Sequence, residues 1–266
     1  MFKTRLISGI VLVIVALGTI IYGGNLLFAT LVIISLIGMS ELYKLLDVHN
    51  KPLGIVGYLG AIIYYGLIYM ERVDLFLMFT IGLVVLLMFV YVFAFPKYKS
   101  DQIMLVFFGM FYVAVMLSFI FRIRVYEEGA FLVWLVFLSS WGCDTCAYCA
   151  GVTMGKHKMA PKLSPKKSIE GGVGGVLGAA VLGALYALCI NKFAGLNESI
   201  LNYAIICGAG GMISQVGDLA ASAIKRNFEI KDYGKLIPGH GGILDRFDSV
   251  IFTAPIIYYL VTFFMK

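Results

Sequence analysis

A cluster of charged residues and glycines lies near the C-terminal end of the sequence, directly before an apolar stretch without any charge. The segment 236–249 reads LIPGHGGILDRFDS and contains His240, Asp245, Arg246 and Asp248. The two aspartates are three residues apart, so they would lie on one side of a helix that had already begun there. Glycines let a backbone approach a ligand closely, and carboxylates are the ligands that hard divalent cations prefer. The segment therefore predicts a polar site at the mouth of a hydrophobic span.

A second group of candidate residues lies at the end of the preceding apolar stretch. Asp218, Ser222, Lys225 and Arg226 follow one another at spacings of four, three and one. On a continuous helix the first three would share one face, where a carboxylate, a hydroxyl and an ammonium group suit a metal ion with a phosphate beside it. With the two aspartates of the first cluster, Asp218 makes three carboxylates able to bind a divalent cation, and we predict Mg²⁺.

Asp144 lies within another apolar stretch, and a basic loop follows it. An aspartate at membrane depth is costly without partners and marks a function by default, although a purely structural carboxyl is the alternative for both Asp144 and Asp218. The loop GKHKMAPKLSPKKSIEGG contains five lysines, and its two prolines prevent a long helix. Its end, with Lys166, Lys167 and Ser168, runs into a glycine-rich helix start that could present lysines and backbone N–H groups to phosphates. A solvated edge that attracts anionic lipids is the other interpretation.

The composition indicates that these polar groups belong to a membrane protein. Hydrophobic residues make up 61% of the chain and charged residues 14%, against roughly 25% charged residues in ordinary soluble domains. A helix needs about 20 mostly apolar residues to cross a membrane. The qualifying stretches are 6–22, 25–43, 53–70, 75–95, 102–121, 130–150, 172–190, 200–221 and 248–265. We therefore expect an all-α, polytopic integral membrane protein with about nine transmembrane helices.

The distribution of basic residues predicts the orientation. With nine spans and the N-terminus inside, sixteen of the 21 lysine and arginine residues fall on the inner side and five on the outer side. Because basic residues collect on the cytoplasmic side, we predict a cytoplasmic N-terminus and cytoplasmic basic loops. The formal charge of +6 then reflects a basic inner face suited to anionic lipids or phosphates, and we expect no nucleic-acid partner. We predict the inner (cytoplasmic) membrane of a bacterium, with the active site facing the cytoplasm.

The chain divides into two parts of different character. Residues 1–125 are N-terminal transmembrane helices with short connections and few polar groups. Residues 126–266 are a C-terminal transmembrane catalytic region with two basic cytoplasmic loops. Glu41 is the polar exception in the first part, and its position near the end of a span favours an interfacial over a functional role.

Small residues predict how the second part packs. Gly171, Gly175, Ala179 and Gly183 recur every four residues, and such a stripe lets two helix backbones approach closely. Neither the Walker pattern nor G-x-G-x-x-G after a strand is present, which argues against a nucleotide-binding loop here. The C-x-x-C-x-x-C run at 143–149 lacks a nearby fourth ligand for a metal site. We therefore interpret these cysteines as packing residues rather than metal ligands and expect no disulfide bonds.

The segment SAIKRNFEIKDYGKLIPGHGGILDRFD, from Ser222 to Asp248, resembles the signature of the phosphatidate cytidylyltransferases, also called CDP-diacylglycerol synthases. The matching positions are Ser222, Ile224, Lys225, Arg226, Lys231, Asp232, Gly234, Pro238, His240, Gly241, Gly242, Asp245, Arg246 and Asp248. The segment CDTCAYCAGVTMGKHKMAPKLSPKKSIEG is similar to the first cytoplasmic segment of that family. There the matching positions are Asp144, Ala147, Tyr148, Gly151, Gly155, Lys156, Ser164, Pro165, Lys166, Lys167, Ser168 and Glu170. The resemblance covers residues 140–250, and before them it rests on hydropathy and span count alone.

The resemblance implies that CTP and phosphatidate react to give CDP-diacylglycerol and pyrophosphate. It implies that Asp218, Asp245 and Asp248 hold Mg²⁺, with a second cation, divalent or K⁺, left open. Catalysis would use these aspartates together with Lys225 and Arg226. The remaining candidates would bind substrate, namely Asp144, Lys166, Lys167, Ser168, Ser222, Lys231, Asp232, His240, Gly241, Gly242 and Arg246. His240 and its glycines would shape the nucleotide pocket or form a purely structural turn, and a homodimer is open as well.

Two other functions fit parts of the sequence. Another CTP-dependent membrane lipid kinase, such as a polyprenol or phytol kinase, would share the broad architecture, although the full signature argues against it. An ion-coupled transporter would use Asp144 and Asp218 as relay groups. Transporters often contain internal repeats with sites at the membrane midplane, and the region 130–250 has no convincing repeat elsewhere in the chain.

Overall fold

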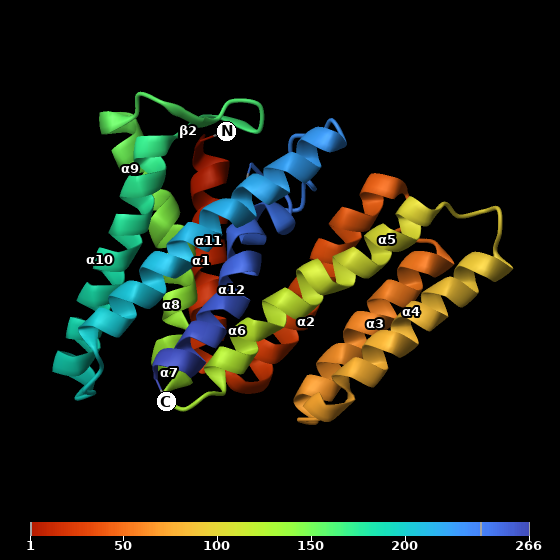
Figure 1. Cartoon of the computed structure of the whole chain (residues 1–266), viewed down its shortest axis with the longest axis horizontal. Coiled ribbons are helices and arrows are strands. Elements are labelled where there is room, and N and C mark those ends of the chain that lie inside the picture. Colours follow the sequence, from red (N-terminus) through yellow and green to blue (C-terminus); the bar gives the residue numbers. More distant parts are fainter. Residues whose placement is uncertain (1, 240, 266) are drawn as a thin grey trace. The chain divides into compact units, whose positions relative to one another are not determined.

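The computed structural model of the chain describes residues 2–239 and 241–265, and most of them are helical (Figure 1). The α-helices are α1 (Phe2–Tyr22), α2 (Gly24–Tyr43), α3 (Pro52–Tyr69), α4 (Phe76–Phe93), α5 (Ser100–Gly109), α6 (Met116–Arg124), α7 (Gly129–Leu132), α8 (Trp134–Phe137), α9 (Cys143–Met154), α10 (Ile169–Ala194), α11 (Ile200–Asn227) and α12 (Leu244–Phe264). Short 3₁₀ turns are η1 (Lys44–Leu46) and η2 (Val73–Leu75), and π-helical segments are η3 (Met110–Val115) and η4 (Leu138–Gly142). The strands are β1 (Lys158–Ala160) and β2 (Ser164–Ser168).

Within the described part of the chain, eight helical segments are long and apolar enough to cross a membrane. They correspond to the second to ninth stretches expected from hydropathy. The first expected stretch, 6–22, falls within α1, whose apolar part Ser8–Tyr22 is a shorter helix. The chain is therefore an all-α polytopic membrane protein, as predicted, with one small two-stranded sheet in addition.

The chain forms two compact units. The first contains the residues up to Ser118 together with Asp232–Asp245. The second contains Phe119–Lys231 together with the residues from Arg246 onward. The division at residue 125 into N-terminal helices and a catalytic region stays a prediction, and the segment Asp232–Asp245 belongs to the first compact unit.

The core of the first unit is held by tyrosines that reach across helices. The hydroxyl of Tyr43 at the end of α2 donates to the carbonyl oxygen of Val106 on α5 at 2.7 Å, and Tyr43 is completely buried. Gly57 and Gly109 make room for its ring, because a Cβ at either position would lie within 2.6 Å of a Tyr43 atom. This packing fixes the C-terminal end of α2, where Glu41 lies.

The second unit is built on close contacts among α9, α10 and α11 (Figure 1). Gly171, Gly175, Ala179 and Gly183 are all buried on α10, which confirms the predicted stripe. A Cβ at Gly175 would lie 2.8 Å from that of Ala147 on α9, and one at Gly183 would lie 2.6 Å from the carbonyl oxygen of Tyr203 on α11. The small residues therefore let α10 contact a neighbouring helix on each side.

The cysteines take part in this packing. Cys143 is buried, and its thiol donates to the carbonyl oxygen of Gly211 at 3.4 Å. Cys146 lies against α10, where a Cβ at Gly178 would come within 2.4 Å of its own Cβ. All five cysteines are free thiols. The packing interpretation of Cys143 and Cys146 is therefore confirmed.

The loop between α9 and α10 folds into an antiparallel β-hairpin. Lys158 pairs with Ser168 and Ala160 pairs with Ser164. The prolines were predicted to prevent a long helix, and this holds. The strands themselves were not predicted, because the segment has no run of β-branched or aromatic residues.

Candidate active site

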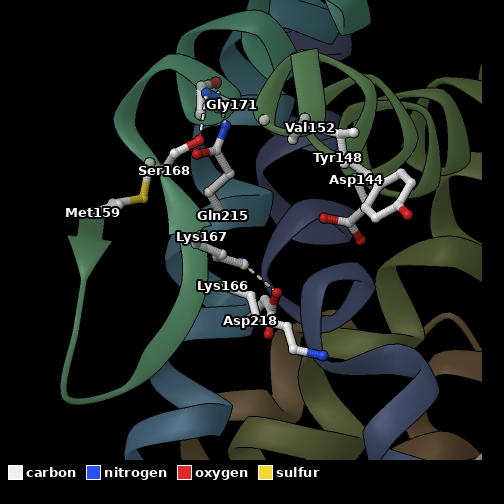
Figure 2. A pocket seen from close by; sticks show the side chains of 13 residues that line it. Asp144, Tyr148, Val152, Met159, Lys166, Lys167, Ser168, Gly171, Gln215 and Asp218 are labelled. Carbon is white, nitrogen blue, oxygen red and sulfur yellow. Dashed lines mark hydrogen bonds and ion pairs between the residues drawn. The ribbon is translucent and has the colours of Figure 1, made fainter. Parts of the chain in front are cut away.

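A cavity of about 510 Å³ lies in the second unit where α9, the hairpin, the start of α10 and α11 meet (Figure 2). Its floor and walls combine apolar side chains with charged groups from the basic loop and from the membrane helices. The lining residues are Asp144, Ala147, Tyr148, Gly151, Val152, Met159, Lys166, Lys167, Ser168, Gly171, Gly172, Gln215 and Asp218. Five of the predicted site residues are among them, namely Asp144, Lys166, Lys167, Ser168 and Asp218.

An ion pair joins the hairpin to α11 inside this cavity. The ammonium group of Lys167 contacts the carboxylate of Asp218, and each side chain is 26% exposed (Figure 2). Ser222 follows one turn later, and its hydroxyl donates to Asp218 Oδ1 at 3.5 Å. Because α11 is unbroken through Lys225, the predicted common face of Asp218, Ser222 and Lys225 is confirmed.

Three aspartates of the second unit lie close enough to interact electrostatically. Asp144 on α9 interacts with Asp218, and it also interacts with Lys167 and Arg246. Asp248, in the second turn of α12, interacts with Asp218, Asp144 and Lys225. Buried or half-buried carboxylates next to each other repel unless cations lie between them. The lysines and Arg246 supply part of that compensation, and a bound cation would supply more.

Local bonds hold the hairpin over the cavity. Ser168 caps α10, since its hydroxyl oxygen accepts a hydrogen bond from Gly171 N at 3.1 Å. Glu170 reaches back to the start of the loop and accepts hydrogen bonds from Lys156 N at 3.1 Å and from His157 N at 3.2 Å. His157 Nδ1 lies 2.5 Å from the same carboxylate.

Gln215 is a lining residue that the sequence did not single out. It lies one turn before Asp218 on α11, and its Nε2 donates to the carbonyl oxygen of Gly172 at 2.8 Å. A polar side chain within an apolar stretch was the available signal, and it is the same signal that identified Asp144. Tyr148 also lines the cavity and is 73% exposed.

The glycine-rich segment 232–245 belongs to the first unit. Asp245 is buried there, and its Oδ2 accepts hydrogen bonds from Tyr233 N at 2.8 Å and from Gly242 N at 2.9 Å. Gly241 has a φ of +88°, a conformation that favours glycine. Asp245 thus has a role in shaping the loop, in addition to the metal-binding role predicted for it. His240 lies outside the described residues.

Glu41, for which the sequence favoured an interfacial role, is buried within the first unit. Its side chain is 3% exposed, and it accepts hydrogen bonds from Ile243 N at 3.0 Å and Leu244 N at 2.9 Å. The sequence could not indicate this contact, because 202 residues separate Glu41 from Ile243.

The other predicted residues lie at the end of α11 and just beyond it. Lys225 and Arg226 are in the last turn of α11, and the guanidinium of Arg226 donates to the carbonyl oxygen of Ile230 at 3.3 Å. Lys231 and Asp232 are exposed. Arg246 is exposed in the first turn of α12.

The three-carboxylate metal centre stays a prediction. Among residues 2–239 and 241–265, no group of three or more His, Cys, Asp or Glu side chains is arranged to hold a metal ion. Asp218 and Asp248 belong to the second unit, while Asp245 belongs to the first. Mg²⁺ is usually held by one or two carboxylates together with substrate phosphates, so Asp218 and Asp248 have the chemistry that it needs.

Comparison with known proteins gives a consistent result over nearly the whole chain. Residues 3–264 match the cytidylyltransferase family. The chain is 29% identical to the phosphatidate cytidylyltransferase of Bacillus subtilis (strain 168), with 98% of each protein covered. It is 31% identical to the phosphatidate cytidylyltransferase of Staphylococcus saprophyticus and 32% identical to that of Staphylococcus aureus (strain COL), in both cases over 97% of this chain and 98% of the relative.

Proposed function

This chain belongs to the cytidylyltransferase family, and we propose that it transfers the cytidylyl group of CTP to phosphatidate, giving CDP-diacylglycerol and pyrophosphate. The observation that carries the proposal is the cavity in which Lys166 and Lys167 of a basic hairpin meet Asp144 and Asp218 of membrane helices. Such a site suits one substrate that arrives from water as a polyanion and another whose phosphate belongs to a lipid.

The reaction needs neutralisation of the negative charge on the two substrates more than it needs proton transfer. The attacking group is a phosphate oxygen that is already ionised at neutral pH, so the reaction needs no general base. Two polyanions must instead be brought together in line, and lysines lower that electrostatic barrier. Lys166 and Lys167 would contact the phosphates of CTP. The Asp218 carboxylate holds the Lys167 ammonium group in the cavity until a phosphate competes for it.

Asp218 and Asp248 are the residues of the second unit that would hold Mg²⁺, and the family resemblance adds Asp245. When bound, Mg²⁺ supplies positive charge to the phosphates and to the attacking oxygen. Asp144 and Arg246, which interact with each other electrostatically, would orient the phosphatidate headgroup at the same site. Lys225 interacts electrostatically with Asp248 and would offset part of the negative charge at this second carboxylate.

For the location, the basic asymmetry of the loops supports a bacterial inner membrane with the hairpin in the cytoplasm. Cysteines introduced at the exposed positions Lys158 and Lys235 of a cysteine-free variant should then react with a membrane-impermeant reagent only from the inside. A cysteine at Lys192, expected on the other side, is the matched control.

Release of pyrophosphate tests the function directly. Purified protein in lipid, given CTP, Mg²⁺ and phosphatidate, should form CDP-diacylglycerol and pyrophosphate in equal amounts, and chelation of Mg²⁺ should stop both. A CTP-dependent lipid kinase would release CDP instead, and an ion-coupled transporter would release neither product. A panel of acceptors with and without a terminal phosphate separates the first two outcomes.

A further inference from the structure

The described part of the glycine-rich segment 232–245, residues 232–239 and 241–245, which we call the signature loop, is held by a carboxylate from a distant helix. Glu41 on α2 accepts hydrogen bonds from Ile243 N through Oε1 and from Leu244 N through Oε2. Because α12 begins at Leu244, these N–H groups belong to a helix start and have no acceptor within the helix. A negative charge at that position also interacts favourably with the helix dipole. Glu41 therefore caps α12 from outside its own sequence neighbourhood.

Two glycines of the signature loop close over the same carboxylate. A Cβ at Gly234 would lie 2.4 Å from Glu41 Oε1, and a Cβ at Gly242 would lie 2.4 Å from Oε1 and 2.5 Å from Oε2. Neither position can accept a side chain while Glu41 stays where it is. At these two glycines the loop backbone therefore lies directly against the Glu41 carboxylate.

Gly242 connects this anchor to Asp245. Its N–H group donates to Asp245 Oδ2, while its Cα lies over Glu41. On α2, Gly38 lies one turn before Glu41, where a Cβ would come within 3.3 Å of the Leu244 side chain. A shift of Glu41 would therefore move Gly242 and Leu244, and with them the backbone donors that orient Asp245.

We propose that Glu41 is a positioning residue for cytidylyl transfer, which keeps the signature loop in the single conformation that the reaction uses. The role of the loop in the reaction rests on the proposed function, whereas the anchoring by Glu41 does not. Glu41 lies outside both segments that resemble the family signatures, so the N-terminal helices contribute to the signature loop a contact that those segments do not contain.

Hydrogen–deuterium exchange and kinetics on the purified, lipid-embedded protein test the proposal with three variants. In Glu41→Ala, amides of the signature loop should exchange faster while those of α3 and α5 keep their wild-type rates. The kcat/KM for CTP should fall by about tenfold to a hundredfold, because two buried donors lose a charged acceptor. Glu41→Gln keeps one acceptor oxygen and should restore part of both properties. Asp47→Asn is the control, since Asp47 is exposed in the same unit and its carboxylate pairs with the ammonium group of Lys51 at the surface.

Each outcome decides the matter. Faster exchange confined to the signature loop, with partial rescue by glutamine, supports the positioning role. Unchanged loop exchange in Glu41→Ala overturns it, and so does faster exchange spread through the whole chain, which would make Glu41 a general stabilising residue. If Glu41→Ala does not fold, wild-type loop exchange and wild-type kcat/KM in Glu41→Gln would overturn it. Failure of the wild-type protein to release pyrophosphate would refute the proposed function. The hydrogen–deuterium exchange result would then still test whether Glu41 anchors the signature loop.

Discussion

The two polar loops of this enzyme, the hairpin and the signature loop, are ordered in different ways. The base of the hairpin between α9 and α10 is held by its own neighbours, since the contacts from Glu170 reach back only 13 or 14 residues. The signature loop is held by Glu41, which lies 202 residues before Ile243. A loop with local anchors can form as soon as its flanking helices do, whereas a loop with a distant anchor needs the N-terminal helices in place.

This difference indicates a structural role for the N-terminal helices. The described residues that line the cavity all belong to the second unit, whereas the N-terminal helices contain the acceptor for the start of α12. Their own core, centred on buried tyrosines, fixes the end of α2 and so fixes Glu41. The hydrophobic helices before residue 118 are thus a support for the signature loop as well as a membrane anchor.

Among the variants that compare the two loops, the largest loss of turnover is expected for a change at Asp245 in the signature loop. Asp245→Asn keeps an oxygen for the N–H groups of Tyr233 and Gly242 but removes the charge that a hard cation needs. We expect a protein that inserts and purifies normally with turnover lower by about 10²–10³. The measurement is turnover at saturating CTP and Mg²⁺.

Asp245→Ala distinguishes the two roles of this residue. It should lose turnover and should also increase amide exchange in the signature loop, because both N–H groups lose their acceptor. Near-normal turnover in Asp245→Asn would falsify the metal assignment and leave Asp245 with the loop-shaping role alone.

A somewhat smaller loss, about 10²-fold, is expected when the hairpin loses its inward lysine. Lys167→Met keeps much of the side-chain length but removes the ammonium group that contacts Asp218 and is proposed to contact phosphate. Lys162→Met, at an exposed hairpin position outside the cavity lining, is the matched control and should keep its turnover. Equal losses in the two variants would mean that the hairpin acts through its overall charge, and the assignment of Lys167 to the phosphates would be withdrawn.

Features set by local sequence were predictable. Hydropathy located the spans, and the spacing of Asp218, Ser222 and Lys225 predicted a shared face because a helix repeats every 3.6 residues. The stripe from Gly171 to Gly183 predicted close packing of α10, and the structure identifies α9 and α11 as its neighbours.

Features set by contacts between distant residues were not predictable. Nothing near Glu41 in the sequence distinguishes an interfacial glutamate from one that caps a helix far along the chain. The hairpin strands depend on pairing across a loop, and the π-helical segment η4 before Asp144 has no sequence pattern of its own. The grouping of 232–245 with the N-terminal helices follows from the same distant contact.

The smallest effect is expected at the base of the hairpin, where Glu170 has a side chain that is 26% exposed. Glu170→Ala removes the acceptor for Lys156 N and His157 N and the contact to His157 Nδ1. Water can replace this acceptor at a partly exposed site, and exposed ion pairs contribute little, so we expect a rise of about three- to tenfold in the KM for CTP with kcat nearly unchanged. Glu170→Gln should recover most of the loss because it keeps an oxygen for the backbone donors. Steady-state kinetics of both variants beside Glu41→Ala measure the contrast between a local anchor and a distant, buried one. A loss in Glu170→Ala as large as that in Lys167→Met would mean that Glu170 itself contacts the nucleotide, and the two loops would then differ less than their anchors suggest.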